Sequence, residues 1–229
     1  MTKYGQFCPI AKALELVGDR WTLLIIRDML MGTSHFNDLE RGLPRISRAL
    51  LASRLRQLQR AGLVEKRPGA AGGAPNEYHL TQAGRELFTV IDSLKLWGET
   101  WAFADPSEED LDPVLLMWWL HNRVDVSSLP RRRVVVQFDF HGAKSVSFWL
   151  ILAQEDVSLC LTDPGYQIDL LVEADLATFF KVWGGQISYQ QALSRHSVNV
   201  EGITGLTQAF PRWFGWNVPA PRDNAVLQA

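Results

Sequence analysis

Residues 47–61 read SRALLASRLRQLQRA, and this stretch decides the fold of the first half of the chain. Its apolar residues recur every three or four positions, which is the period of an amphipathic helix. Ser47 is a preferred helix N-cap, and the run ends at Ala61-Gly62. The apolar side carries Leu50, Leu51, Leu55, Leu58 and Ala61, whereas the opposite side carries Ala49, Ala52, Ser53, Arg56 and Arg60, flanked by Arg48. One side can therefore pack on a core, while the other is small near its start and basic along its length.

The segments around this helix follow a definite order. Three shorter helical periods precede it, at Pro9–Val17, about Arg20–Met31 and His35–Arg41. Two strand-like runs follow at 63–67 and 77–80, separated by the glycine-rich stretch 68–75, and Thr81 caps a long helix that reaches about Phe103. This order predicts a winged helix-turn-helix domain over residues 1–104. The acidic, proline-containing stretch 105–112 is expected to be a linker.

The outward side of the 47–61 helix has the chemistry of a DNA-recognition helix. Small side chains let a helix approach base edges, and its N-terminal turns enter the major groove. We expect DNA contacts from Arg45, Ser47, Arg48, Ala49, Ser53, Arg54 and Arg56 around this helix, and from Lys66, Arg67 and Asn76 in the wing. Arg45, Arg48 and Ser53 are expected at bases or nearby phosphates, and Arg54, Arg56 and Arg60 at the backbone. The alternative is a solvated helix whose arginines serve solubility.

Charge divides along the chain. Residues 1–104 hold 14 Lys and Arg against 10 Asp and Glu, a net charge of +4, whereas residues 105–229 hold 9 against 15, a net charge of −6. The first half therefore favours a polyanionic partner. The two cysteines give neither a disulfide framework nor zinc-ligand spacing, and we expect no metal and no cofactor. The apolar run Val114–Leu120 is too short to span a membrane, so we expect a soluble cytoplasmic protein with no membrane partner.

Several motifs of the first half occur together in one known family. They are Cys8-Pro9-Ile10, Gly18-Asp19-Arg20-Trp21-Thr22, Phe36-Asn37-Asp38-Leu39, Leu43-Pro44-Arg45-Ile46-Ser47, Gly62-Leu63-Val64, Tyr78-His79-Leu80-Thr81 and Trp97-Gly98. Over about residues 5–102 the chain resembles the HxlR family of bacterial winged-helix regulators. The resemblance implies a homodimeric transcriptional regulator whose first and last helices build the dimer core. It also implies two recognition helices in successive major grooves of a near-palindromic double-stranded DNA operator.

The resemblance also makes Cys8 a redox candidate, because some members of that family sense oxidants through the cysteine at this position. Cys8 precedes Pro9 at the expected start of a helix, where the helix dipole favours a thiolate, and Lys12 follows four residues on. The alternative is a small, inert cysteine that is buried at a dimer interface.

The C-terminal half alternates apolar and polar residues in the manner of β-strands. The alternating runs are 134–140, 146–152, 157–161 and 166–172, with turn residues at Glu155-Asp156 and Asp163-Pro164-Gly165. A helix is expected at 113–123, and helical segments are expected after Glu173. The pattern predicts an α+β domain over residues 113–229, in which helices cover the apolar face of an antiparallel meander.

The end of this half carries Ala174-Asp175-Leu176, Trp183-Gly184-Gly185 and Val198-Asn199-Val200-Glu201-Gly202. These motifs resemble the end of a sterol carrier protein type 2 domain, in which sheet and helices enclose an apolar tunnel. The resemblance implies a hydrophobic small-molecule effector, and the candidate pocket residues are Trp118, Phe138, Phe148, Phe180 and Trp183. The alternative is that these aromatic side chains fill a core or a dimer interface.

No nucleophile, base and orienting group occur together in one motif, so we expect no enzymatic activity. The expected function is DNA-binding transcriptional regulation, controlled by a hydrophobic ligand or by oxidation of Cys8. The competing function is that of a lipid or small-molecule carrier, in which the winged helix is only a scaffold.

Overall fold

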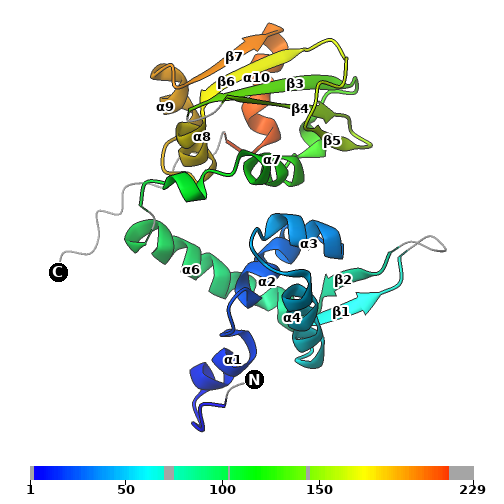
Figure 1. The fold of residues 1–229 in the computed structure, drawn as a ribbon, viewed down its shortest axis with the longest axis vertical. Coiled ribbons are helices and arrows are strands. Elements are labelled where there is room, and N and C mark those ends of the chain that lie inside the picture. The colour runs from blue at the N-terminus through cyan, green and yellow to red at the C-terminus, as the bar shows by residue number, and fades with distance from the viewer. Residues whose placement is uncertain (1–2, 70–74, 103, 143–144, 217–229) are drawn as a thin grey trace. The chain divides into compact units, whose positions relative to one another are not determined.

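A computed structural model of the 229-residue chain describes residues 3–69, 75–102, 104–142 and 145–216. The chain divides into two compact units, Met1–Phe103 and Ala104–Ala229 (Figure 1). The stretch 105–112 belongs to the second unit and contains the short 3-10 helix η1 (Glu108–Asp110). Within that unit, the carboxylate of Asp105 pairs with Lys181 Nζ at 2.7 Å.

The N-terminal unit has the predicted winged helix-turn-helix order, which is thereby confirmed. Its elements are α1 (Pro9–Val17), α2 (Thr22–Leu30), α3 (Phe36–Gly42), α4 (Arg48–Arg60), β1 (Val64–Arg67), β2 (Glu77–Leu80), α5 (Gln82–Glu86) and α6 (Phe88–Trp101). Strands β1 and β2 pair antiparallel, with Val64 opposite Leu80 and Arg67 opposite Glu77. The tip of the glycine-rich loop, residues 70–74, lies outside the described residues.

The predicted single closing helix is wrong in one respect, because it is divided into α5 and α6. Thr81 Oγ1 accepts a hydrogen bond from Gly84 N at 3.2 Å and caps α5. Gly84 lies so close to β1 that an added Cβ would be 2.2 Å from the carbonyl oxygen of Leu63. Leu87 N then bonds to the carbonyl three residues back, at 3.3 Å, which tightens the last turn of α5. This close approach fixes α5 against the wing and lets α6 start in a new direction.

The core of the N-terminal unit lies under the predicted inner side of α4. Leu51, Leu55 and Leu58 are each at most 1% exposed. They pack in one cluster with Ile25 of α2 and Leu39 of α3. Burial of these leucines supplies much of the stabilisation of a small domain, because each buried side chain contributes about 1.5–3 kcal/mol. The outer side of α4 is thus left free of any role in the core.

The C-terminal unit is built on a five-stranded sheet, and the predicted α+β class is confirmed. Its further elements are α7 (Pro113–Asn122), η2 (Val126–Ser128), β3 (Val134–His141), β4 (Val146–Leu152), β5 (Val157–Cys160), β6 (Leu170–Asp175), α8 (Leu176–Trp183), α9 (Tyr189–Ser194), β7 (Val198–Gly202) and α10 (Thr204–Trp213). The strand order is β5-β4-β3-β6-β7, and every pairing except β3 with β6 is antiparallel.

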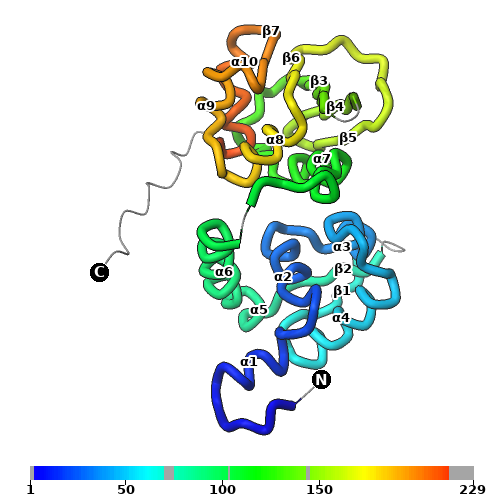
Figure 2. The backbone as a smooth tube through the Cα atoms, turned by 60° about the vertical axis from the view of Figure 1, so that its left-hand side comes forward, coloured from blue at the N-terminus to red at the C-terminus, as the bar shows by residue number. Residues whose placement is uncertain are grey.

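The predicted meander is therefore wrong in two respects, because it misplaced β6 and did not include the fifth strand, β7. β6 crosses over to the far side of β3 and runs parallel to it, with Leu170 opposite Val136. Residues 161–169 make this crossing as a wide arc (Figure 2). Tyr166 and Ile168, which were expected in a strand, lie in this exposed loop, where the guanidinium of Arg133 stacks 4.0 Å from the Tyr166 ring. Alternation along a strand identifies its buried face but not its neighbour, which explains the error.

One face of the sheet holds the apolar core, which the helices of this unit cover. Phe138 and Phe140 of β3 contact Phe179 of α8, with ring centroids 6.1 and 5.2 Å apart, and Phe138 also contacts Phe210 of α10 at 6.2 Å. The opposite face is polar around Gln137, whose side-chain oxygen accepts from Trp149 Nε1 at 3.1 Å. The sheet is thus one-sided, as the alternation predicted.

Candidate nucleic-acid interface

The start of α4 is fixed by the three residues before it. Ile46 is buried in the core of the N-terminal unit. Ser47 has an extended backbone, and its Oγ accepts a hydrogen bond from Leu50 N at 3.2 Å. Arg45 has a φ of +72°, in the left-handed region, which costs a non-glycine residue about 1–2 kcal/mol. These constraints hold the first turn of α4 at a defined place on the surface.

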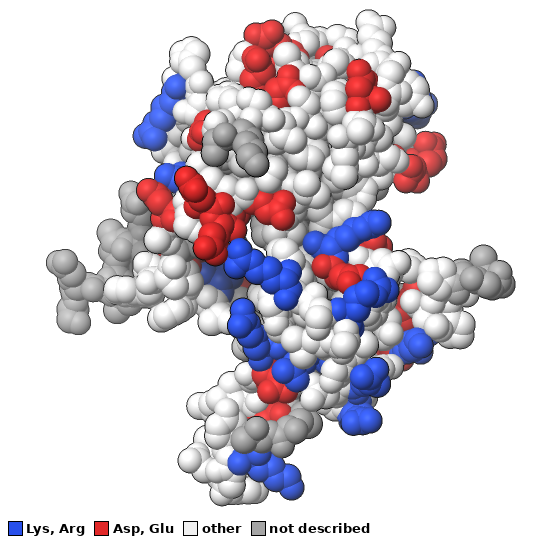
Figure 3. All heavy atoms as spheres, viewed as in Figure 1, with Lys and Arg blue, Asp and Glu red and all other residues white. Residues whose placement is uncertain are grey.

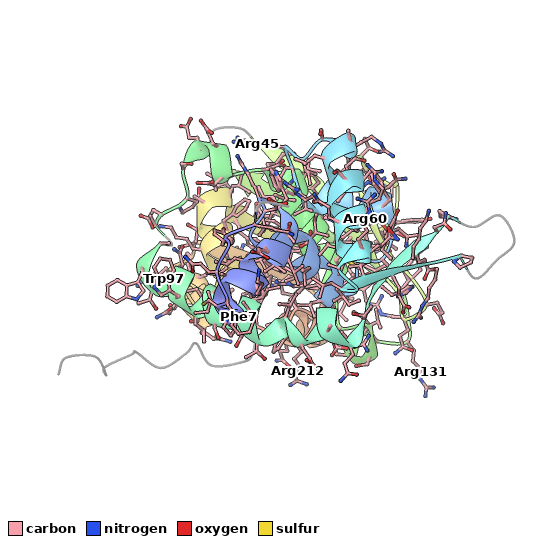
Figure 4. All side chains as sticks on the ribbon, turned by 90° about the horizontal axis from the view of Figure 1, so that it is seen from below. Phe7, Arg45, Arg60, Trp97, Arg131 and Arg212 are labelled. Carbon is pink, nitrogen blue, oxygen red and sulfur yellow. The ribbon has the colours of Figure 1, made fainter. Side chains whose placement is uncertain are left out.

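The outer side of α4 presents cations and small side chains. Arg45, Arg48, Ala49, Arg56 and Arg60 are exposed, and Ser53 is half-buried. Figure 4 labels Arg45 and Arg60, which mark the two ends of this surface. We name it the α4 surface, comprising Arg45, Ser47, Arg48, Ala49, Ser53, Arg56 and Arg60. A helix with its side chains is about 10–12 Å across, which suits the width of a DNA major groove, about 12 Å.

Arg48 is held in place by helix α3. Its guanidinium donates to the carboxylate of Glu40 and, at 3.1 Å, to Asn37 Oδ1. The same guanidinium lies 5.0 Å from the centre of the Phe36 ring. Glu40 offsets part of the Arg48 charge, while the three contacts restrict the side chain to one region of the α4 surface. Arg48 is thus a directed donor rather than a mobile cation.

Arg54 differs from the other arginines of α4. Its Nη1 donates to Asp19 Oδ2 at 2.8 Å and to Gln57 Oε1 at 2.7 Å, and its Nε donates to the carbonyl oxygen of Arg20 at 3.2 Å. Its side chain is only 16% exposed. Arg54 therefore lies against the turn between α1 and α2, at the edge of the α4 surface.

The wing contributes two further cations and one amide beside the α4 surface. Lys66, Arg67 and Asn76 are exposed at the described ends of β1 and β2, and Arg67 pairs with the carboxylate of Glu65. The buried pair Val64 and Leu80 anchors the base of the hairpin in the core. The wing is thus fixed at its base and carries its charge toward its tip.

A histidine and carboxylate cluster that the sequence did not indicate ties the wing to α3. His79 Nε2 lies 2.8 Å from Glu77 Oε2, and His35 Nε2 lies 3.9 Å from Glu77 Oε1. Beside them, Tyr78 N donates to the Ser34 carbonyl oxygen at 2.8 Å. The period of two in β2 places Glu77 and His79 on one face, which was a usable signal. No such signal indicated that His35, which lies 42 positions before Glu77 in the sequence, would approach the Glu77 carboxylate.

The charge on the surface follows the division seen in the sequence. Figure 3 shows basic side chains spread over the N-terminal unit and acidic side chains grouped on the C-terminal unit. The α4 surface and the wing both belong to the basic unit. A local positive potential of this kind attracts a polyanion and speeds its association.

Comparison with known proteins identifies the family of this unit. The family described as HxlR-like helix-turn-helix matches residues 16–106. The uncharacterized HTH-type transcriptional regulator YvaP of Bacillus subtilis is 31% identical over 104 residues, which cover 45% of this chain and 94% of YvaP. The chain belongs to the HxlR-like helix-turn-helix family.

Two other similar proteins extend the comparison. The uncharacterized HTH-type transcriptional regulator Rv3095 of Mycobacterium tuberculosis is 47% identical over 90 residues, which cover 39% of this chain. The match spans about half of that relative's own length, namely 56%. The crystal structure of PA1607 shares 35% identity and covers 47% of this chain and 75% of its own, with a TM-score of 0.43.

The HxlR-like unit leaves a large apolar surface uncovered. No residue of α6 is buried, and Trp97 and Trp101 are 58% and 72% exposed. Figure 4 shows the Trp97 side chain pointing outward from α6. In the α1 region, Phe7, Ile10 and Leu14 are exposed as well. We refer to these side chains as the apolar surface of α1 and α6.

Cys8 lies at the N-cap position of α1, with extended backbone and a half-buried side chain. Lys12, which was expected to act on the thiol, instead pairs with the carboxylate of Glu15 at 3.0 Å. The hydrogen bond from Lys12 lowers the pKa of Glu15. The environment of Cys8 is therefore set mainly by the first turn of α1.

The predicted pocket residues fall into two kinds of site. Phe138 and Phe148 are at most 2% exposed and belong to the core of the C-terminal unit. Trp118, Phe180 and Trp183 are half-buried. Trp118 stacks on His121 at 5.4 Å, whereas Trp183 stacks on Trp119 at 6.3 Å and meets the guanidinium of Arg123 at 4.3 Å.

No helix among the described residues is long and apolar enough to cross a membrane.

Proposed function

We propose that this protein is a sequence-specific transcriptional regulator that binds double-stranded DNA through α4 and the wing. The observation that carries the proposal is the α4 surface, where cations and small side chains project from a helix whose start is fixed by buried Ile46 and the Ser47 cap. Such a helix can enter the major groove, while phosphate contacts from its flanks and from the wing set its register. The relatives named above as HTH-type transcriptional regulators support this assignment and give no reason to expect an enzyme.

The contacts divide into two classes in this proposal. Arg45, Arg48 and Ser53, near the start of α4, read base edges or nearby phosphates, with Ser47 and Ala49 allowing close approach. Arg56 and Arg60, with Lys66, Arg67 and Asn76 of the wing, meet the backbone. Arg48→Ala or Ser53→Ala is expected to change operator preference. Arg56→Ala is expected to weaken binding to all DNA and to lower the salt slope by about one unit.

The decisive experiment measures binding of the full chain to its own promoter DNA and to random DNA of equal length, by fluorescence anisotropy at several salt concentrations. We expect tighter binding to the promoter, and a linear fall of log affinity with log salt for both DNAs. Absence of DNA binding at low salt, together with no retention on heparin, would overturn the proposal in favour of the carrier function.

We further infer that the DNA-binding species is a homodimer. The apolar surface of α1 and α6 supports this, because exposed apolar area on this scale is normally covered by a partner. A dimer with a two-fold axis places two α4 helices on a near-palindromic operator whose half-sites are about 34 Å apart. The measurement is a footprint on the promoter, which is expected to show two half-sites at that spacing.

The C-terminal unit is proposed to respond to a hydrophobic ligand. Two polar groups in its aromatic interior support this. Trp213 Nε1 is buried without a hydrogen-bond partner among the described residues, and burial raises the pKa of the Tyr189 hydroxyl to about 12. The probe is a series of fatty acids, tested for a rise in melting temperature and a change in operator affinity, with Trp183→Ala as the control. No stabilisation by any member would favour a dimerisation or partner-docking role.

Oxidation of Cys8 is the other proposed control. The position of Cys8 at the first turn of α1 supports it, because α1 also carries part of the apolar surface. Peroxide is expected to change operator affinity in the wild type and to leave Cys8→Ser unaffected. An equal response of both proteins would remove Cys8 from the mechanism.

A further inference from the structure

We infer that Arg54 does not contact DNA but locks the recognition helix onto the turn between α1 and α2. This inference rests on the proposed DNA binding. Three acceptors surround the guanidinium: the Asp19 carboxylate at 2.8 Å, the Gln57 side-chain oxygen at 2.7 Å and the main-chain oxygen of Arg20 at 3.2 Å. The planar guanidinium of Arg54 would lose these three hydrogen bonds if it moved to a phosphate. Arg54 is in this view a positioning residue.

The place of Arg54 on the helix explains why it differs from its neighbours. Leu51 lies three residues before it and Leu58 four residues after it, and both are fully buried. Residues at these spacings share one side of a helix, so the Arg54 side chain leaves from the margin of the core. Arg56 projects about 200° further around the helix and is exposed. The two arginines therefore leave α4 from different sides of the helix.

The turn that receives Arg54 is itself closely constrained. Thr22 N donates to the Asp19 carbonyl at 3.1 Å, and Trp21 has a φ of +78°, a left-handed conformation that large side chains rarely adopt. At the start of the turn, a Cβ on Gly18 would lie 2.6 Å from the carbonyl oxygen of Leu14 in α1. This turn joins α1 to α2 with little conformational freedom. Arg54 attaches α4 to the turn through the Asp19 carboxylate and the main-chain oxygen of Arg20.

The lock therefore connects two surfaces of the N-terminal unit. Ile10 and Leu14 of α1 belong to the exposed apolar surface, and the α4 surface lies at the other end of the connection. A change in the orientation of α1 moves the turn between α1 and α2. Through Arg54, it also moves the N-terminal part of α4, which faces DNA. Arg54 acts on DNA only through the orientation of α4.

The two possible roles of Arg54 make opposite predictions for Asp19. If Arg54 binds a phosphate, Asp19 competes for it, so that Asp19→Asn should tighten DNA binding. If Arg54 positions α4, Asp19→Asn should weaken binding, because the lock loses its charged partner. The number of phosphate contacts also differs, and it is reported by the dependence of affinity on salt.

The test measures operator affinity of the full chain at several salt concentrations for Arg54→Gln, Asp19→Asn and the double variant, with Arg56→Gln as the control. We expect each single change to weaken binding about tenfold without changing the salt slope, and the double variant to be no weaker than either, as for two members of one contact. Arg56→Gln should lower the slope by about one unit. A lower slope for Arg54→Gln, a tighter Asp19→Asn variant, or additive losses would overturn the lock.

A second readout separates the lock from the proposed function. Unfolding of the same four proteins by denaturant tests whether Asp19 and Arg54 are coupled without any DNA. If the Asp19 and Arg54 substitutions are coupled in unfolding but the wild type does not bind DNA, the proposed function is overturned. Only the structural contact between Asp19 and Arg54 would then stand. If Arg54→Gln fails to fold, Arg54→Lys keeps the charge and loses the multidentate geometry, and it is expected to weaken operator binding with an unchanged salt slope.

Discussion

Helices α6 and α10 both carry tryptophan, yet they place it in opposite environments. Trp97 and Trp101 of α6 are more than half exposed, whereas Trp213 of α10 is fully buried. Around Trp213, Phe210 packs against the rings of Tyr189, Phe214 and other aromatic residues at centroid distances of 5.3–6.2 Å. Similar side chains thus complete a core in one unit and leave a surface open in the other.

This difference separates what each unit can do alone. The C-terminal unit encloses its apolar side chains, so its stability depends on internal packing. The HxlR-like unit keeps its core small and leaves apolar area on α1 and α6, so its stability in solution depends on what covers that area. Changes in the core of the C-terminal unit are therefore expected to have a large effect on unfolding. Changes in the apolar surface of α1 and α6 are expected to have a large effect on association.

The closed core provides the largest expected effect. Phe210→Ala removes the ring at the centre of the aromatic cluster and should lower the free energy of unfolding of the C-terminal unit by about 3–5 kcal/mol, because the cavity cannot close fully. Ile168→Ala, in the exposed loop of the same unit, should cost less than about 1 kcal/mol. The measurement is urea unfolding followed by near-ultraviolet circular dichroism. Equal losses for the two variants would mean that the core is loosely packed.

The open surface of α6 should affect association instead. Trp97→Ala is expected to weaken the dimer by about 2 kcal/mol, which is the loss typical of a central aromatic residue in an interface. Its effect on unfolding of the dissociated chain should be small, because Trp97 is 58% exposed there. Sedimentation over a range of protein concentrations measures the change.

A matched control lies on the same helix. Lys95 pairs with Glu99 at 3.4 Å on the surface of α6, and Lys95→Ala should leave association nearly unchanged, since exposed ion pairs contribute at most about 1 kcal/mol. A wild type that stays monomeric at micromolar concentration and still binds its operator with full affinity would contradict the dimer proposal.

The same comparison shows which features a sequence can predict. The inner and outer sides of α4 followed from helical period alone, because Leu51, Leu55 and Leu58 recur at 3.6-residue spacing. The parallel pairing of β6 with β3 could not be predicted, since the alternation of residues in β6 is the same whichever strand lies beside it. Features local in sequence were therefore predictable, whereas the pairing of distant strands was not.

The candidate interface divides in the same way. The cap formed by Ser47 could be predicted from residue type and position, and the structure has it. The contacts of Arg54 with Asp19 and of His35 with Glu77 join residues 35 and 42 positions apart. Helical period places Arg54 nearer the core than Arg56, but only the packing of the turn shows which acceptors the Arg54 guanidinium meets.

Burial in the closed core gives the next largest effect, and it depends on pH. Burial raises the pKa of Tyr189 from 10.0 to about 12, so the folded state favours the neutral phenol. The resulting stabilisation is complete below pH 10 and is lost as the pH rises from 10 through 12, by up to about 2 kcal/mol. Tyr189→Phe should remove this part of the alkaline decline, as seen by urea unfolding at pH 9 and pH 11.5. Parallel pH profiles for the wild type and the variant would show that Tyr189 does not titrate in the fold.

The smallest expected effect compares one helix cap in each unit. Ser47 Oγ accepts from Leu50 N at 3.2 Å at the start of α4, and Ser188 Oγ accepts from Gln191 N at 3.1 Å at the start of α9. Ser47→Ala and Ser188→Ala should each lower the free energy of unfolding of their own unit by about 1 kcal/mol, because each leaves a helix amide without its acceptor. Only Ser47→Ala should also weaken operator binding, since α9 belongs to the enclosed unit and α4 presents its first turn to DNA. The two changes are matched in chemistry and in their cost to stability. A loss of operator affinity in both variants would mean that the loss follows from reduced stability. A loss in neither variant would mean that the first turn of α4 is not part of the interface.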